Sequence, residues 1–228
     1  MTKMKSSHVR GDYVFKEVDG NLEFVGDFNG LYKNDSDPWD QSATTDQEIT
    51  CYYKSSRKRL IEQLNVISPT SILEIGCGLG YTTKTLQDAF PKIDVTGMDI
   101  SDVAIKKARK LFPNLSFICA DIRDVLPFEK MESTYDVVIL NQLLWYILKQ
   151  LPSSFENCQR ILKAGGKIAI SQAFPKTKLR YGTEICDGFE SFIEHLNKNF
   201  KNFKINYLNL DASKEFIHDD AIIMLSTA

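Results

Sequence analysis

The stretch ILEIGCGLGY, residues 72–81, joins an apolar run to three glycines and decides the fold. The apolar run, 71–75, has the length and composition of a short buried strand. The glycines predict a tight turn into a helix over 81–90, because glycine adopts positive φ and lets a ligand approach the backbone closely. The first N–H groups of that helix have no partner within the helix. We therefore expect a ligand site where this strand ends.

The alternation of apolar runs and helical stretches continues to residue 227. Apolar runs predict strands at 71–75, 94–98, 115–119, 135–140, 167–171, 203–210 and 221–227. Helices are predicted at 81–90, 101–111 with Ser101 as N-cap, 153–162 and 188–199. This alternation is typical of an α/β fold, in which helices cover both faces of a parallel sheet. The last two strands lack a helix between them, which predicts an antiparallel edge.

The first 46 residues do not follow this alternation. Two β-prone runs flank a dipeptide that favours a hairpin turn, namely 13–18 and 21–25 around Asp19-Gly20. The polar stretch 33–45 is predicted to be a loop, and helix-spaced apolar residues predict a helix over 47–64. We therefore divide the chain into an N-terminal hairpin and lid segment, 1–46, and a domain over 47–228.

Composition limits the classes of partner. The 228 residues include 43% hydrophobic and 25% charged residues, as in soluble globular proteins. A net charge of −2 gives no support for a nucleic-acid partner. The run 137–148, VVILNQLLWYIL, is too short and too polar at its centre to span a membrane. No signal peptide is visible, and five scattered cysteines form no metal-binding or disulfide pattern, so we expect a reduced, cytoplasmic protein without a metal site. The oligomeric state is not predicted.

Two ligand classes compete for the glycine turn. A dinucleotide motif, G-x-G-x-x-G, would need glycine or alanine where this chain has Tyr81, and no G-x-x-x-x-G-K-[ST] phosphate loop occurs. The remaining pattern is E-x-G-x-G-x-G, with Glu74 at the end of the strand. A carboxylate would repel a phosphate but suits the ammonium group of an amino acid, directly or through water. A nicotinamide-dependent oxidoreductase remains an alternative, which failure of the chain to bind NAD would exclude.

Several linked motifs occur in the order known from one enzyme family. They are the glycine turn 74–80, VTGMD ending at Asp99, CADIRD at 119–124, YDVVILNQLLWYIL at 135–148 and ILKAGGKIAIS at 161–171. Together they resemble class I S-adenosylmethionine-dependent methyltransferases over about residues 55–228. The resemblance implies S-adenosylmethionine as cofactor. It also implies a Rossmann-like three-layer sandwich, whose seven-stranded and mostly parallel sheet has the order 3-2-1-4-5-7-6 and an antiparallel last strand.

The resemblance also assigns cofactor-binding residues. Asp99 would receive both ribose hydroxyls, since an ionised carboxylate can accept two O–H bonds. Asp121 would accept the adenine amino group, with Ile100 and Ile122 on either side of the ring. The remaining cofactor-binding residues of the strand and its turn are Glu74, Gly76, Cys77, Gly78 and Gly80.

Asn141 and Gln142 interrupt an apolar run where the fourth predicted strand should end. At that tip they would face the reactive sulfonium, although Asn141 could instead cap the following helix. Trp145 and Tyr146, a helical turn further on, would lie at the substrate mouth, where aromatic faces attract a cation. Core packing is the alternative for both rings.

A narrower resemblance is to NodS-like methyltransferases of sugars and other small metabolites. It covers DFNGLYKNDSDPWDQ (27–41), YYKSSRKRL (52–60) and LLWYIL (143–148). It implies that Tyr53 and Arg57 reach the methionyl end of the cofactor, and that the segment with Trp39 closes over the site. Trp39 could equally be a hydrophobic anchor. Members often have Ser-Glu at positions 141–142, whereas Gln142 can orient a substrate but cannot act as a base.

These residues predict methyl transfer to an amine or hydroxyl of a small molecule, with sugars and nucleotide-sugars among the acceptors. The catalytic candidates are Gln142 and His218, which precedes the last strand. An amine acceptor is slightly favoured, because a hydroxyl acceptor would require a general base such as His218. A non-catalytic adenosyl-binding module and an RNA-directed methyltransferase remain open as alternatives.

Overall fold

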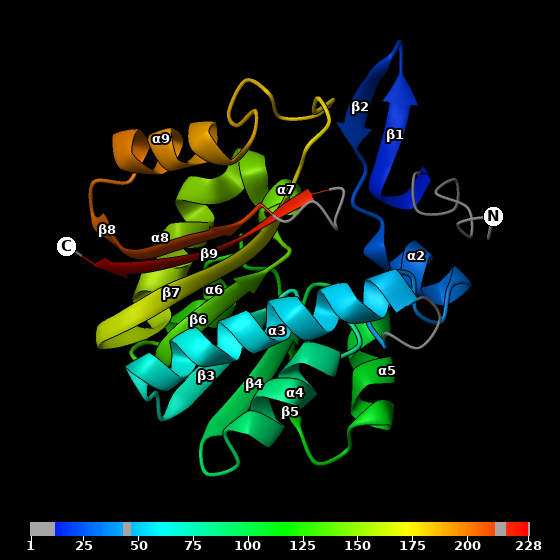
Figure 1. Cartoon of the computed structure of the whole chain (residues 1–228). Coiled ribbons are helices and arrows are strands. Elements are labelled where there is room, and N and C mark those ends of the chain that lie inside the picture. The colour runs from blue at the N-terminus through cyan, green and yellow to red at the C-terminus, as the bar shows by residue number, and fades with distance from the viewer. Residues whose placement is uncertain (1–11, 43–46, 213–217, 228) are drawn as a thin grey trace.

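The computed structural model describes residues 12–42, 47–212 and 218–227. Its centre is a seven-stranded sheet with the order β5-β4-β3-β6-β7-β9-β8 (Figure 1). The strands are β3 Ser71–Ile75, β4 Asp94–Asp99, β5 Ser116–Cys119, β6 Tyr135–Asn141, β7 Leu162–Pro175, β8 Phe203–Asp211 and β9 His218–Thr227. In chain order this is 3-2-1-4-5-7-6, so the predicted sheet order is confirmed.

The strand directions also confirm the prediction. The pairs β5–β4, β4–β3, β3–β6 and β6–β7 are parallel, whereas β9 is antiparallel to both β7 and β8. Parallel strands buried on both faces appear in sequence as continuous apolar runs, which is why their positions were visible. β7 is longer than predicted, because Leu162 already pairs with Tyr135 before an irregularity in the register.

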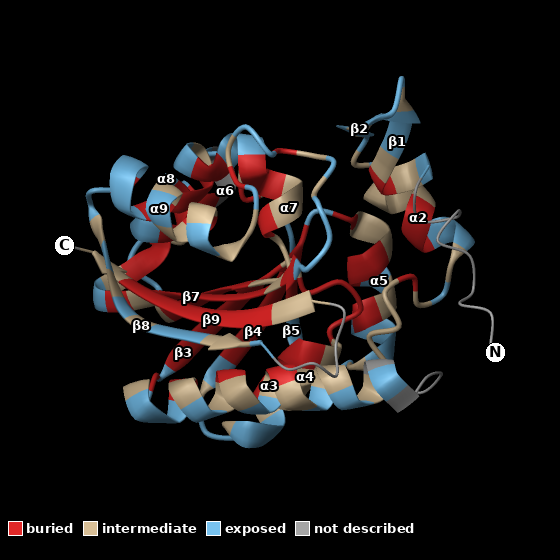
Figure 2. Ribbon diagram, turned by 45° about the horizontal axis from the view of Figure 1, so that its top comes forward, coloured by how far each residue is buried: buried red, intermediate tan, exposed pale blue. Residues whose placement is uncertain are grey.

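Helices cover both faces of the sheet (Figures 1 and 2). They are α3 Gln47–Ile67, α4 Tyr81–Ala89, α5 Asp102–Leu111, α6 Leu126–Glu129, α7 Leu144–Ile147, the 3₁₀ helix η1 Leu148–Gln150, α8 Leu151–Ile161 and α9 Phe189–Asn199. One core layer packs α3 and α4 on the sheet, and the other packs α7, α8 and α9 on the opposite face. Ser101 is the N-cap of α5, as predicted, and accepts a hydrogen bond from the Ala104 N–H.

The N-terminal segment lies at the end of the sheet where β3, β4 and β6 finish (Figure 1). The predicted hairpin is present as β1 Phe15–Val18 and β2 Asn21–Phe24, paired antiparallel. The predicted loop from residue 33 is wrong at its start, because α2 Phe28–Asn34 occupies this part. Asp27 stabilises α2 as its N-cap by accepting from the Gly30 N–H at 2.8 Å. Residues 43–46, part of the same predicted loop, lie outside the described residues.

Within the described ranges, no helix is both long and apolar enough to cross a membrane.

Candidate functional site

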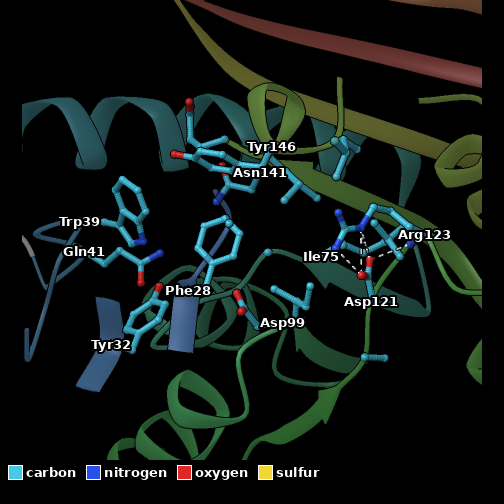
Figure 3. A pocket seen from close by; sticks show the side chains of 18 of the residues that line it. Phe28, Tyr32, Trp39, Gln41, Ile75, Asp99, Asp121, Arg123, Asn141 and Tyr146 are labelled. Atoms are coloured by element: carbon cyan, nitrogen blue, oxygen red, sulfur yellow. Dashed lines mark hydrogen bonds and ion pairs between the residues drawn. The ribbon is translucent and has the colours of Figure 1, made fainter. Parts of the chain in front are cut away.

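A cavity opens at the carboxyl ends of β3, β4, β5 and β6. Its empty space, including the part open to solvent, is about 1100 Å³. Open α/β sheets bind ligands at this edge. The lining comes from the strand tips, from α3 and α7, and from the N-terminal segment with β2 and α2 (Figure 3). Segments distant in sequence therefore meet around one space.

The glycine turn begins on the wall of this cavity. Gly76 lines it, with φ +77°. A Cβ at Gly76 would lie 3.1 Å from Leu143, so a side chain would crowd the wall. The Gly76 and Cys77 N–H groups both donate to the Met98 carbonyl, at 2.8 and 2.9 Å. The turn is thereby fixed against the end of β4, next to Asp99.

Asp99 is a buried carboxylate on the lining, 8% exposed. It accepts from the Gly78 N–H and the Ser101 N–H, both at 2.8 Å and on different oxygens. Burial raises the pKa of Asp99, and these two hydrogen bonds act in the opposite direction. Each oxygen retains a second lone pair. Asp99 can therefore accept two further hydrogen bonds from a molecule in the cavity.

Asp121, at the tip of β5, carries an ion pair within the cavity lining. Arg123 donates through Nε to both carboxylate oxygens, at 2.8 and 2.9 Å, and through Nη2 to Oδ2 at 2.5 Å. Figure 3 shows this pair on the side of the cavity away from Trp39 and Gln41. Ile100 and Ile122 line the cavity as well. A ligand that hydrogen-bonds to Asp121 must share it with Arg123.

Glu74 is fully buried and does not reach the cavity. Its carboxylate accepts from Thr83 Oγ1 at 2.5 Å and from Asn141 Nδ2 at 3.1 Å. Burial raises its pKa, whereas the Thr83 and Asn141 hydrogen bonds lower it. Asn141 does line the cavity, and the N-cap of α7 is Leu143. The alternative in which Asn141 caps that helix is therefore wrong, because its side chain orients toward Glu74.

Residues 72–166 match a methyltransferase domain family. The matched residues contain the glycine turn, Asp99, Asp121 and the tip of β6.

The chain is also similar to individual methyltransferases and to solved structures. A malonyl-[acyl-carrier protein] O-methyltransferase from Anoxybacillus flavithermus is 37% identical over 103 residues, which are 44% of this chain and 38% of that protein. The chain thus spans well under two thirds of that relative. The PH0226 protein of Pyrococcus horikoshii superposes with a TM-score of 0.67 at 17% identity, covering 88% of this chain and 100% of that one. The N-methyltransferase NodS of Bradyrhizobium japonicum gives 0.58 at 20% identity, covering 76% and 97%.

At these identities the two structural likenesses show the fold alone, so the NodS-like group is not confirmed. The family match and the named relative support the resemblance of this chain to class I S-adenosylmethionine-dependent methyltransferases. They imply S-adenosylmethionine as the cofactor of the methyltransferase domain.

Gln142 lies at the tip of β6 and lines the cavity, with φ +53°. Its Nε2 donates to Tyr52 Oη at 2.7 Å and to Asp220 Oδ1 at 3.3 Å. Its Oε1 accepts from the Ala173 N–H at 2.8 Å and from Gln172 Nε2 at 3.3 Å. Both donors and both lone pairs of the carboxamide are thus in use. Gln142 is held in place and has no hydrogen-bonding capacity left for a substrate.

Some predicted cofactor residues face away from the cavity. Cys77 is fully buried against Ile105, Ala108 and Phe117, so its side chain is a core residue. Gly80 is the N-cap of α4, and a Cβ there would lie 2.6 Å from the Phe117 ring. Its absent side chain permits close packing of the helix on the strand.

Gly78 and Arg57 contact the N-terminal segment. A Cβ at Gly78 would lie 2.5 Å from Tyr32 Oη and 2.6 Å from Gln41 Oε1. Arg57 donates to the Gln41 carbonyl at 2.9 Å and to Thr82 Oγ1 at 3.1 Å, and it lies outside the cavity lining. The prediction that its guanidinium faces a cofactor carboxylate is therefore not met in this structure, where Arg57 fastens the segment instead.

Tyr53 does line the cavity, and its hydroxyl donates to the Trp39 carbonyl at 2.7 Å. Trp39 and Tyr146 line it as well, with their ring centroids 5.9 Å apart. Trp145 does not: its ring packs edge-on against Phe174, and its Nε1–H donates to the Ala173 carbonyl at 3.2 Å. For Trp145 the alternative of core packing is correct.

His218 also lies outside the cavity lining. Its ring meets the Tyr52 ring edge-to-face, with centroids 4.6 Å apart. Burial lowers the pKa of His218. The predicted general base is thus placed behind Tyr52, away from the space that a substrate would occupy.

The sequence reasoning missed several lining residues, namely Phe24, Phe28, Tyr32, Gln41, Arg123 and Leu143. Tyr32 and Gln41 fall within the quoted stretch 27–41, and Gln41 Oε1 accepts from the Leu79 N–H at 3.0 Å. Arg123 is within the quoted CADIRD motif. The quoted motifs thus contained several of these residues, but the sequence did not indicate which of their side chains point into the cavity.

Proposed function

We propose that the chain transfers the methyl group of S-adenosylmethionine to an amine of a small molecule. The observation that carries this proposal is the uneven distribution of charged and aromatic residues around the cavity at the strand tips. One end offers two carboxylates, Asp99 and Asp121, at neighbouring strand tips. The other end, around Gln142 and Tyr146, is uncharged and partly aromatic.

The residues of the first end fit an adenosine group. Asp99 has two unused lone pairs for a ribose diol. Ile100 and Ile122 provide apolar surface for a flat ring, and Asp121 would accept an amino group by sharing its oxygens with Arg123. Gly76 leaves room because no Cβ projects from the wall. Asn141, oriented by Glu74, would contact the methionyl end.

When bound, the sulfonium cofactor supplies the methyl group and a good leaving group. The chain then contributes position, orientation and shielding from water. The N-terminal segment covers the site through Tyr32 and Gln41, which lie against Gly78. Gln142 keeps the turn between β6 and α7 in its positive-φ conformation, and so fixes the direction of Tyr146.

An amine is favoured over a hydroxyl as the acceptor. An amine reacts in its neutral form, whereas a hydroxyl needs a group to take its proton. Among the described lining residues, the acidic groups are Asp99 and Asp121, both proposed to hold the adenosine, and no histidine is present. A hydroxyl acceptor, including a sugar, remains the second candidate, since His218 and Tyr52 lie behind Gln142.

Two further alternatives are an adenosyl-binding module without turnover and an enzyme that acts on RNA. Isothermal titration with S-adenosylmethionine, followed by transfer of labelled methyl to amines, alcohols, sugars and RNA, separates them. The proposal expects cofactor binding and transfer to amines. Binding without transfer to any acceptor would favour the module, transfer to RNA the RNA enzyme, and absence of binding would overturn the proposal.

A further inference from the structure

Four aromatic residues form one wall of the cavity, which we call the aromatic wall: Phe24, Phe28, Trp39 and Tyr146. Tyr146 contacts each of the others. Its ring centroid is 5.4 Å from Phe28, edge-on, 5.9 Å from Trp39 and 6.3 Å from Phe24, nearly stacked. Figure 3 shows Phe28, Trp39 and Tyr146 together, on the side opposite Asp121 and Arg123. The wall is therefore the surface available to an acceptor.

The wall is built from distant segments and is supported from behind. Phe15 of β1 packs on Tyr146 and on Tyr181, with centroids 6.1 and 4.9 Å away. Arg180, next to Tyr181, pairs with Glu17 at 2.9 Å and donates to the Gly20 carbonyl at 3.1 Å. The hairpin is thus attached to the loop after β7. This attachment holds Phe24 against Tyr146.

Charge is distributed unevenly around the cavity. Among the described lining residues the cation is Arg123, and it is paired with Asp121 at the end opposite the wall. Arg57 donates to Gln41 and Thr82 and stays outside the lining. A carboxylate or phosphate placed against the wall would therefore lose water without gaining a cationic partner, which is unfavourable. Aromatic faces, by contrast, attract a cation and pack on flat apolar groups.

We infer that the acceptor is an amine attached to an aromatic or apolar group, and that it carries no carboxylate or phosphate beside that amine. This inference rests on the proposed function and narrows it to one substrate class. It separates this chain from an acceptor such as a malonyl group, which carries a carboxylate and occurs in the name of one relative. It also disfavours nucleotide-sugars, which carry phosphates.

Matched acceptor pairs test the inference, because the members of a pair differ by one carboxylate. Phenethylamine is compared with phenylalanine, and tryptamine with tryptophan, with a malonyl thioester as a further acid. Initial rates of labelled methyl transfer are measured on the full chain at saturating S-adenosylmethionine. We expect kcat/KM for each amine to exceed that for its acid partner by about tenfold or more.

Two substitutions link that preference to the wall. Phe24→Lys places a cation there and should raise the rate with phenylalanine relative to phenethylamine. Tyr146→Leu removes the central ring and should reduce the preference, whereas Tyr146→Phe keeps the ring and serves as its matched comparison. Cofactor affinity and thermal unfolding of each variant show whether the site and the fold persist.

The outcomes distinguish this inference from the proposed function. Equal or faster transfer to phenylalanine or tryptophan would overturn the inference and leave the proposed transfer to an amine standing. Equal or faster transfer to the malonyl thioester, which has no amine, would overturn both the inference and the amine acceptor of the proposed function. Cofactor binding without transfer to any acceptor would overturn both. A preference that is the same in the wild type, Phe24→Lys and Tyr146→Leu would show that the wall does not select the acceptor.

Discussion

Gln142 and Asp220, 78 residues apart in the chain, meet at the tip of β6, where Nε2 of Gln142 lies 3.3 Å from Oδ1 of Asp220. Asp220 is buried and also pairs with Arg59. Tyr52 lies between them, hydrogen-bonded to both side chains. A neutral carboxamide at position 142 is compatible with this buried carboxylate, whereas a second carboxylate would be repelled.

Gln142→Glu is therefore expected to make stability depend on pH. Two adjacent carboxylates raise the pKa of one of them above its value in the unfolded chain, so the folded state is penalised as pH rises. The variant should be less stable than the wild type by about 1–3 kcal/mol at pH 8, and closer to it at pH 5. Urea unfolding at several pH values measures this.

The double variant Gln142→Glu with Asp220→Asn is the matched control, because it restores a single carboxylate to the pair. The double variant should lose most of the pH dependence of stability that Gln142→Glu introduces. A loss of stability that is equal at pH 5 and pH 8, or that persists in full in the double variant, would contradict the pairing.

Gly78→Ala should weaken cofactor binding by displacing the N-terminal segment. Its added Cβ would lie 2.5 Å from Tyr32 Oη and 2.6 Å from Gln41 Oε1, at φ +54°. We expect the affinity for S-adenosylmethionine to fall by about tenfold or more, equivalent to about 1.4 kcal/mol or more, as measured by titration calorimetry.

Gly165→Ala separates this effect from backbone strain. Gly165 has φ +77° with nothing within 4 Å of its added Cβ, so it carries similar strain away from the cavity. This control should lose some stability and keep its cofactor affinity. Equal affinity losses in both variants would mean that strain, and not the contact with Tyr32 and Gln41, explains the result.

Asp136 joins β6 to the start of β3 and should contribute to acid stability. One carboxylate oxygen accepts from the N–H and the hydroxyl of both Thr70 and Ser71, and pairs with Lys163 at 3.2 Å. Although burial acts to raise the pKa of Asp136, these hydrogen bonds lower it to about 2. A depressed pKa stabilises the folded state above the pKa of the unfolded chain, about 3.9. This stability is lost as pH falls from about 4 to about 2.

Asp136→Asn should therefore cost about 2 kcal/mol at pH 7 and much less near pH 2. Unfolding free energies at both pH values measure it. Asp102→Asn is the control, since Asp102 pairs with Lys106 on an exposed helix surface and such pairs contribute little. Similar costs for the two substitutions, or a cost for Asp136→Asn that does not shrink in acid, would show that this hydrogen-bond cluster does not stabilise the fold.

The central strands of the sheet could be predicted because they are buried on both faces. Residues 71–75 and 135–140 therefore form mostly apolar runs, and polar residues such as Asn141 mark where a strand ends. Asp99 could be located because it ends the next apolar run along the chain after the glycine turn. The carboxyl ends of neighbouring parallel strands meet at one edge of the sheet. The local rules at Asp19-Gly20 and Ser101 also held, because turns and caps depend on few residues.

Side-chain direction could not be predicted. Trp145 and Tyr146 are adjacent on a one-turn helix, and only the fold decides that the first enters the core and the second the cavity. Glu74 and Arg57 carry charges that suit a cofactor, yet tertiary contacts direct them to Asn141 and Gln41. The inward face of α2 depends on how the segment docks, which no local periodicity specifies.

The most direct test of the cofactor site is a titration of S-adenosylmethionine into the wild type and Asp99→Ala, repeated with an analogue that lacks the ribose hydroxyls. We predict that the wild type binds the cofactor, that Asp99→Ala loses about 1–3 kcal/mol, and that the analogue shows little difference between the two proteins. Asp102→Ala, on the exposed side of α5, should bind like the wild type. Failure of the wild type to bind, or unchanged affinity in Asp99→Ala, would contradict the placement of the cofactor across these strand tips.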